Sequence, residues 1–192
     1  MGIIIEESKI LKILSKRYAH VLITEIRCKK DLNGLLKRKP DLVFSGVKYF
    51  NFNKEKIWLN DCLESCNIPY IASNRTALDN ESNKNIAKKL ILKAKIKTAD
   101  FFITNPDQHQ NESSIPISFP LFIKPVKGGD SRGIDSNSVV YDFSSFKKKV
   151  LEIKYKYNLS SLVETYLPGK EYSVGIFQDS IKGTLRAMPI EI

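Results

Sequence analysis

A glycine-rich loop between residues 124 and 133 has the residue types that suit the binding of an anion. Lys124 stands near the end of an apolar run, and glycines follow at positions 128, 129 and 133. Glycine allows positive φ and a close approach to the backbone, and successive amides of such a loop can cradle phosphate oxygens. The spacing matches neither the Walker loop nor the dinucleotide fingerprint. The loop alone therefore predicts a plain hairpin as readily as a phosphate site.

Two carboxylates, Glu164 and Glu171, flank a Pro-Gly turn after a second apolar run. A carboxylate at the end of a strand can accept a hydrogen bond from an adenine amino group, and one after the turn can bind ribose hydroxyls. Taken in isolation, the pair is better read as two solvated glutamates on a hairpin. Lys124 is a sharper signal, because a charge that interrupts an apolar run needs a partner.

The elements that must position these residues begin with helices and strands that alternate through residues 1–76. Such alternation is typical of a parallel sheet with crossover helices. The periodicity predicts helices over 7–17 and 57–66, a short helix capped by Asp31 that contains Leu32, Leu35 and Leu36, and strands over 20–24, 42–44 and 68–72.

The second half has a different pattern, with more strands and one long helix. A helix over 80–95 is expected to turn Ile86, Leu90, Ile91 and Ala94 to one face, and the polar stretch 105–114 reads as a connection. We expect strands over 101–104, 120–125, 139–141 and 162–166, a helix over 143–155, and antiparallel strands over 171–177 and 184–192. The fold class is therefore α/β, becoming α+β in the second part.

Composition excludes several classes of protein. No apolar run approaches the roughly 20 residues that a membrane span needs, and the N-terminus lacks the basic region of a signal peptide. The formal charge is +10, but the lysines are spread over polar faces of amphipathic segments, so no nucleic acid is expected as a partner. These features favour a cytoplasmic protein.

Taken together, the motifs resemble the ATP-grasp superfamily, and most closely the D-alanine–D-alanine ligase group. The matching segments occur in the family's order from about Pro40 to the end: 68–73, Lys84, 119–125, 129–134, 163–174 and 189–192. The resemblance implies a Rossmann-like domain at 1–76 that precedes the ATP-grasp domain. It also implies the nucleotide-binding portion of an ATP-grasp domain at 77–192.

The resemblance also implies roles for residues in an ATP site. Lys84 and Lys124 are implied to hold the phosphates, Glu164 the adenine amino group and Glu171 the ribose. The flap over the phosphates corresponds to Gly128, Gly129, Asp130, Ser131 and Arg132, and the hinge beside the base to Thr165, Tyr166 and Leu167. The implied activity joins a carboxylate to an amine through an acylphosphate, as in peptidoglycan or peptide biosynthesis. The resemblance implies ATP and Mg²⁺ as cofactors and amino acids as substrates. It is also compatible with a homodimer.

Two departures from the family pattern limit what the resemblance implies. The family's Asp, Glu and Asn ligands for Mg²⁺ lie downstream of the segment matched by Glu191 and Ile192, so no catalytic or metal residue is assigned here and the lone chain is expected to be inactive. Residues 45–53 replace family segments that bind the first amino acid, and Asp130 replaces a serine, so D-alanine is not assigned as the substrate. The alternatives are a non-catalytic nucleotide-binding remnant or regulator and, more weakly, a basic nucleic-acid-binding protein.

Overall fold

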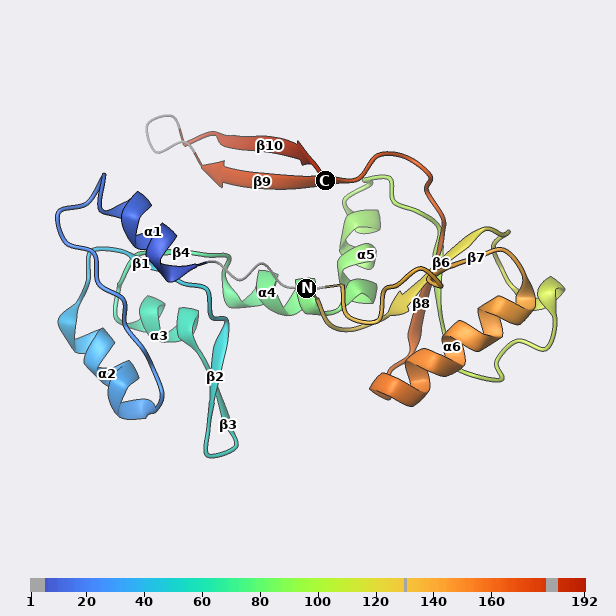
Figure 1. The fold of residues 1–192 in the computed structure, drawn as a ribbon, viewed down its shortest axis with the longest axis horizontal. Helices are drawn as coiled ribbons and strands as arrows, with labels where there is room; N and C mark the ends of the chain where they lie inside the picture. The colour runs from blue at the N-terminus through green and yellow to red at the C-terminus, as the bar shows by residue number, and fades with distance from the viewer. Residues whose placement is uncertain (1–5, 130, 179–182) are drawn as a thin grey trace.

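The computed structural model describes residues 6–129, 131–178 and 183–192. Figure 1 shows an elongated molecule in which the first three helices and a four-stranded sheet lie at opposite ends. The helix α4 (Arg75–Ser82) lies between these two parts, and a terminal hairpin extends away from the sheet. No helix in the described ranges has the length and apolar content to cross a membrane.

The N-terminal region is built around one parallel strand pair. Strand β1 (Val43–Phe44) pairs in parallel with β4 (Tyr70–Ile71), which confirms the predicted parallel connection. The helices of this region are α1 (Glu7–Leu14), α2 (Lys29–Arg38) and α3 (Leu59–Ser65). The core of this region consists of Leu32 and Leu35 of α2, Leu59 and Leu63 of α3, and Ile68, whereas α1 contributes no buried residue.

Two predictions for this region are wrong. The apolar run 20–24 forms no strand, and Leu22 is 78% exposed. An apolar run needs a neighbouring strand for its backbone hydrogen bonds, and the described pairing of β1 is with β4. Asp31 is also not the N-cap residue of α2, because the helix begins two residues earlier, after Cys28; Asp31 instead stabilises this end as the third helical residue of a capping box with Cys28. Its carboxylate accepts from the amides of Arg27 at 2.9 Å and Cys28 at 3.1 Å.

A hairpin that the periodicity did not predict follows β1. Strands β2 (Tyr49–Phe52) and β3 (Glu55–Trp58) pair antiparallel through a two-residue turn. Asn53 and Lys54 both have positive φ, 51° and 67°, as a tight hairpin turn of the primed type requires. The predicted helix over 57–66 therefore begins only at Leu59, because Trp58 belongs to the hairpin.

The predicted helix over 80–95 is interrupted. Helix α4 ends at Ser82, and α5 (Lys84–Lys93) begins after Asn83, whose extended backbone (φ −121°, ψ 96°) breaks the run. Asn83 forms an isolated antiparallel bridge with Lys127. The break therefore docks the start of α5 against the glycine-rich loop. The domain boundary expected after residue 76 lies inside α4 and stays a prediction.

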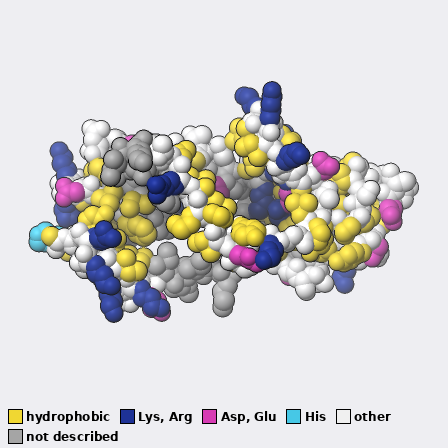
Figure 2. Space-filling view, turned by 90° about the horizontal axis from the view of Figure 1, so that it is seen from above, with side chains coloured by type: hydrophobic (Ala, Val, Ile, Leu, Met, Phe, Trp, Pro, Cys, Tyr) yellow, Lys and Arg dark blue, Asp and Glu magenta, His cyan; other side chains and the backbone are white. Residues whose placement is uncertain are grey.

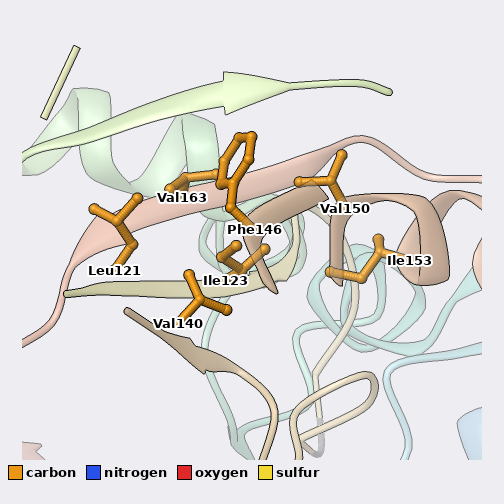
Figure 3. Close-up of a cluster of buried hydrophobic side chains, with 7 residues drawn as sticks. All are labelled: Leu121, Ile123, Val140, Phe146, Val150, Ile153 and Val163. Atoms are coloured by element: carbon orange, nitrogen blue, oxygen red, sulfur yellow. The ribbon is translucent and has the colours of Figure 1, made fainter. Parts of the chain in front are cut away.

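The second half contains a four-stranded antiparallel sheet in the order β5–β8–β6–β7. Its strands are β5 (Phe101–Thr104), β6 (Leu121–Pro125), β7 (Val139–Val140) and β8 (Ser161–Thr165), and a short 3-10 turn (Glu112–Ser114) lies between β5 and β6. Helix α6 (Phe143–Tyr157) covers one face. The core between them, drawn in Figure 3, consists of Leu121, Ile123, Val140, Phe146, Val150, Ile153 and Val163. These predicted strands and the long helix are confirmed.

The chain closes with an antiparallel hairpin, which confirms the predicted pairing. Strand β9 (Tyr172–Gln178) pairs along its full length with β10 (Leu185–Glu191). Apolar side chains of both strands are exposed, among them Val174, Ile176, Leu185 and Ile190. In Figure 1 the two strands lie apart from the four-stranded sheet.

Candidate functional site

Strand alternation divides the four-stranded sheet into an apolar face and a charged face. Successive side chains of a strand point to opposite faces, and in β6 Leu121 and Ile123 pack against α6. Lys124 therefore lies on the other face. In β8 the same alternation turns Val163 toward α6 and Glu164 away from it. The face opposite α6 thus carries a lysine and a glutamate on adjacent strands.

Glu164 is the centre of a buried ion cluster. Its side chain is 10% exposed, and its Oε2 lies 2.5 Å from the Nζ of Lys124. The strand register sets this contact, because Phe122 pairs with Glu164 and Lys124 stands two residues further along β6. The other carboxylate oxygen, Oε1, accepts a hydrogen bond from the Nζ of Lys88 on α5.

The two ammonium groups keep the Glu164 carboxyl ionised. Burial by itself raises the pKa of Glu164, but the hydrogen bonds from Lys124 and Lys88 outweigh burial and hold the pKa below its ordinary value. An ionised carboxylate only accepts hydrogen bonds. The site therefore presents a fixed acceptor at neutral pH.

The apolar periodicity of α5 does not predict that Lys88 is buried. Ile86 and Leu90, expected on the buried face, are 42% and 45% exposed, whereas Lys88 is buried. Its partner Glu164 stands 76 residues later, so no local pattern reveals the pairing. The one available signal is the spacing of Lys84 and Lys88, which places two lysines on the same face of a helix.

Lys84, at the start of α5, contacts the glycine-rich loop. Its Nζ donates to the carbonyl oxygen of Gly128. Its backbone amide donates to the carbonyl of Val126 at 3.0 Å, and the amide of Gly128 donates to Ser82 at 3.1 Å. Burial, followed by the charge of Lys124, lowers the pKa of Lys84. Two of the predicted lysines are thus close enough to repel each other.

The loop itself needs its glycines. Gly128 has φ +104°, and among the described residues no atom lies within 4 Å of the place that a Cβ would take, so this side of the loop is open with respect to those residues. Gly133 has φ +77°, and a Cβ there would lie 2.5 Å from Cγ of Pro125. Gly129 and Ser131 are exposed, and the Arg132 guanidinium lies 4.9 Å from the centre of the Tyr157 ring. Asp130 lies outside the described residues.

The predicted hinge, residues 165–167, begins at the end of β8, and hydrogen bonds join its first two residues to the sheet region. The amide of Thr165 donates to Asp100 and that of Tyr166 to Pro120, both at 3.0 Å, while Leu167 is exposed. The carbonyl of Glu171 accepts from the amide of Ile192 at 3.1 Å. Within the described ranges no ion pair joins the Glu171 side chain to the cluster, so the structure brings together Lys84, Lys124, Glu164 and the loop but not Glu171.

Other features of the surface give weaker candidates. Two shallow hollows lie elsewhere, one beside Asn105 and His109 and one beside Phe101 and Ile117, and neither is lined by Lys84, Lys88, Lys124 or Glu164. Within the part of the chain that the structure describes, no three His, Cys, Asp or Glu side chains are grouped to hold a metal ion. Figure 2 shows basic side chains dispersed over the visible face rather than gathered in one patch.

Sequence comparison finds D-alanine–D-alanine ligases among curated proteins. The ligase of Bacillus anthracis is 28% identical over 144 residues, which covers 74% of this chain and 46% of the ligase. That of Pelagibacter ubique is 28% identical over 188 residues, which covers 94% of this chain and 58% of the ligase. No model of a known protein family matches the chain. The chain spans about half the length of the curated relatives it matches.

Solved structures give the same picture of the fold. A crystal structure of D-alanine–D-alanine ligase from Bacillus anthracis superposes with a TM-score of 0.59 at 20% identity, covering 98% of this chain and 68% of that one. A structure of the same enzyme complexed with ATP gives 0.54 at 22% identity, covering 87% and 58%. The arrangement of helices and strands is therefore that of these enzymes, which confirms the predicted fold class.

Proposed function

This chain is a D-alanine–D-alanine ligase-like protein with the fold of the ATP-grasp ligases, and from that premise we propose that it forms the nucleotide-binding part of an ATP-dependent carboxylate–amine ligase. One observation carries the proposal. Glu164, Lys124 and Lys84 meet beside a glycine-rich loop, although they stand on two strands and a helix.

The charge of the cluster suits a triphosphate. Lys88 and Lys124 contact the Glu164 carboxylate, and Lys84 is close enough to feel the charges of Lys124 and Glu164, so three lysines and one carboxylate leave a formal net charge of +2 in a half-buried place. The nearby Glu81 carboxylate is paired with Lys48, so it does not cancel this excess. The open side of Gly128 leaves room for phosphate oxygens near the loop amides. ATP therefore fits the residues present, with Lys84 and Lys124 as its phosphate ligands.

The base is proposed to lie against the hinge. Glu164 is the proposed acceptor for the adenine amino group, and its lowered pKa keeps this carboxyl ionised at neutral pH. Because the amides of Thr165 and Tyr166 already donate within the sheet, the hinge would meet the base through the Leu167 amide or through carbonyl oxygens. The Glu171 side chain is exposed, and its proposed role as the ribose ligand rests on the resemblance to the ligase family.

The proposed reaction has two steps. An oxygen of the substrate carboxylate attacks the γ-phosphorus, the bond to the β-γ bridging oxygen breaks, and an acylphosphate and ADP result. An amine then attacks the acyl carbon, loses a proton, and expels inorganic phosphate. In both steps this chain's lysines neutralise charge and hold the phosphates in place. Among the described residues, no three His, Cys, Asp or Glu side chains are grouped to hold Mg²⁺.

A nucleotide-binding protein without turnover is the second candidate. The described contacts of Lys84, Lys124 and Glu164 can bind and orient ATP, and none of them removes a proton from an amine. Release of ADP and phosphate with a panel of amino acids distinguishes the two candidates. Steady release above the rate without amino acid supports the ligase, and binding without release supports the second candidate.

Calorimetric titration with ATP tests the shared part of the proposal. Lys124→Met removes the charge and keeps the length of the side chain, so Kd is expected to rise about tenfold or more, equivalent to ~1.4 kcal/mol. Lys89→Met, at an exposed lysine of α5, is the matched control and should leave Kd within about twofold. Equal affinity of the Lys124 variant and the native chain would exclude this cluster as the phosphate site.

A further inference from the structure

Lys88 is a buried cation of the cluster that the proposed function does not place against any part of the nucleotide. Its side chain is 9% exposed, less than half the 22% of Lys124. Its Nζ donates to Glu164 Oε1 and, at 2.9 Å, to Thr98 Oγ1, and it lies 4.9 Å from the centre of the Phe101 ring. A lysine that is removed from water in this way needs compensating partners. All three partners hold the ammonium in one place.

The two lysines that contact Glu164 are not equivalent. Lys124 is the more exposed one and approaches Oε2, so an incoming phosphate can compete for its charge. Lys88 approaches Oε1 from α5, and its ammonium group is also held by a hydrogen bond to the Thr98 hydroxyl. When Lys124 turns to a phosphate, Lys88 is the cation that remains to keep the carboxylate charged and oriented.

We infer that Lys88 is a positioning residue that holds the Glu164 carboxylate as a pure acceptor and thereby selects 6-amino purines over 6-oxo purines. The inference rests on the proposed function, in which Glu164 faces the base. A 6-amino group offers hydrogens to the carboxylate, whereas a 6-oxo group places a second acceptor opposite it. A carboxylate that becomes protonated or rotates away loses this distinction.

The test compares three probes that share a triphosphate: ATP, ITP and inorganic tripolyphosphate. Calorimetry gives Kd for the native chain, Lys88→Met, Lys88→Arg and the exposed control Lys89→Met. The native chain is expected to prefer ATP over ITP by about tenfold or more, as for one well-placed hydrogen bond. Lys88→Met should bring that ratio close to one, because it weakens the binding of ATP much more than the binding of ITP or tripolyphosphate, which lose only the same attraction to the phosphates. Lys88→Arg should restore most of the ratio, and Lys89→Met should not change it.

Each of the other possible outcomes contradicts one part of the inference or of the proposed function. An unchanged ATP-to-ITP ratio in Lys88→Met overturns the role of Lys88. Equal weakening of all three probes shows that Lys88 supports the structure without selecting the base. If the native chain binds tripolyphosphate but does not prefer ATP, the base site fails while the phosphate site stands. If it binds none of the probes, the proposed function itself fails.

A second variant covers the case in which Lys88→Met does not fold, as judged by circular dichroism. Thr98→Val removes the hydroxyl that accepts a hydrogen bond from Lys88 and leaves the charges of Lys88 and Glu164 in place. The ATP-to-ITP ratio should then fall in the same direction but by a smaller factor. A ratio equal to that of the native chain would overturn the inference.

Discussion

The N-terminal region and the four-stranded sheet region bury helices against strands in different ways. The first has one parallel pair of two-residue strands and a core of five buried side chains. The second has four paired strands and a core of seven, and it also buries Lys88, Lys149 and Glu164. Within the described residues, the buried polar side chain of the first region is the neutral Asn60. Buried charge thus accompanies the better-paired sheet: strand register places Lys124 beside Glu164, while Lys88 and Lys149 reach their carboxylate partners from helices α5 and α6.

The largest expected effect comes from removing a core side chain beneath the charged face. Ile153 is fully buried between α6 and the sheet, so Ile153→Ala should cost ~2–5 kcal/mol of unfolding free energy. Leu151, on the same helix and 59% exposed, is the control and should change by less than ~0.5 kcal/mol on conversion to Ala. Urea titration followed by circular dichroism measures both.

The same variant shows whether the two regions unfold separately. Trp58, the single tryptophan, is buried in the N-terminal region, so its fluorescence reports that region. The two cores share no residue. Ile153→Ala should therefore lower the circular dichroism midpoint and leave the fluorescence midpoint in place. Coincident shifts of both signals would show one cooperative unit and remove the distinction between the regions.

An intermediate effect is expected in the loop beside the cluster. Gly133→Ala combines positive φ with a clash against Pro125, so it should destabilise the chain by more than ~1 kcal/mol. Gly128→Ala has the strain of positive φ but open space around it, and it should cost less. Thermal unfolding of the two variants separates the clash from the strain. Equal losses would mean that the clash relaxes at no cost.

The smallest effect concerns two helix caps, one at the start of α6 in the sheet region and one at the start of α4, which lies between the two regions. Asp142 Oδ1 accepts from Ser145 at 2.8 Å at the start of α6, and Asn74 Oδ1 accepts from Ala77 at 3.0 Å at the start of α4. Each change to Ala should cost about 1 kcal/mol locally. Because α6 has four buried residues and the described α4 has none, only Asp142→Ala should lower the global midpoint. Amide hydrogen exchange should show fraying of α4 in Asn74→Ala; a matching global loss there would contradict this.

The sequence predicted the strands of the second half well, because each is a short apolar run that differs clearly from the helical periodicity of residues 143–155. Lys124 stood out for the same reason, since it interrupts such a run. Lys88 could not be found, because a lysine in a helix reads as solvated until its distant partner Glu164 is known. The loose N-terminal region was predicted less well. Its β2–β3 turn uses Asn53 and Lys54 without a glycine, and the run 20–24 has the composition of a strand without a pairing neighbour.

The terminal hairpin has a practical consequence for anyone who handles this chain. Strands β9 and β10 form a sheet of their own, so each has one edge whose backbone groups are open to pairing with another molecule. The exposed apolar side chains of Val174, Ile176 and Ile190 favour association of these edges with other molecules. Concentrated solutions should therefore aggregate through this hairpin, and binding measurements will give cleaner results at low protein concentration or with a fused partner that shields residues 172–191.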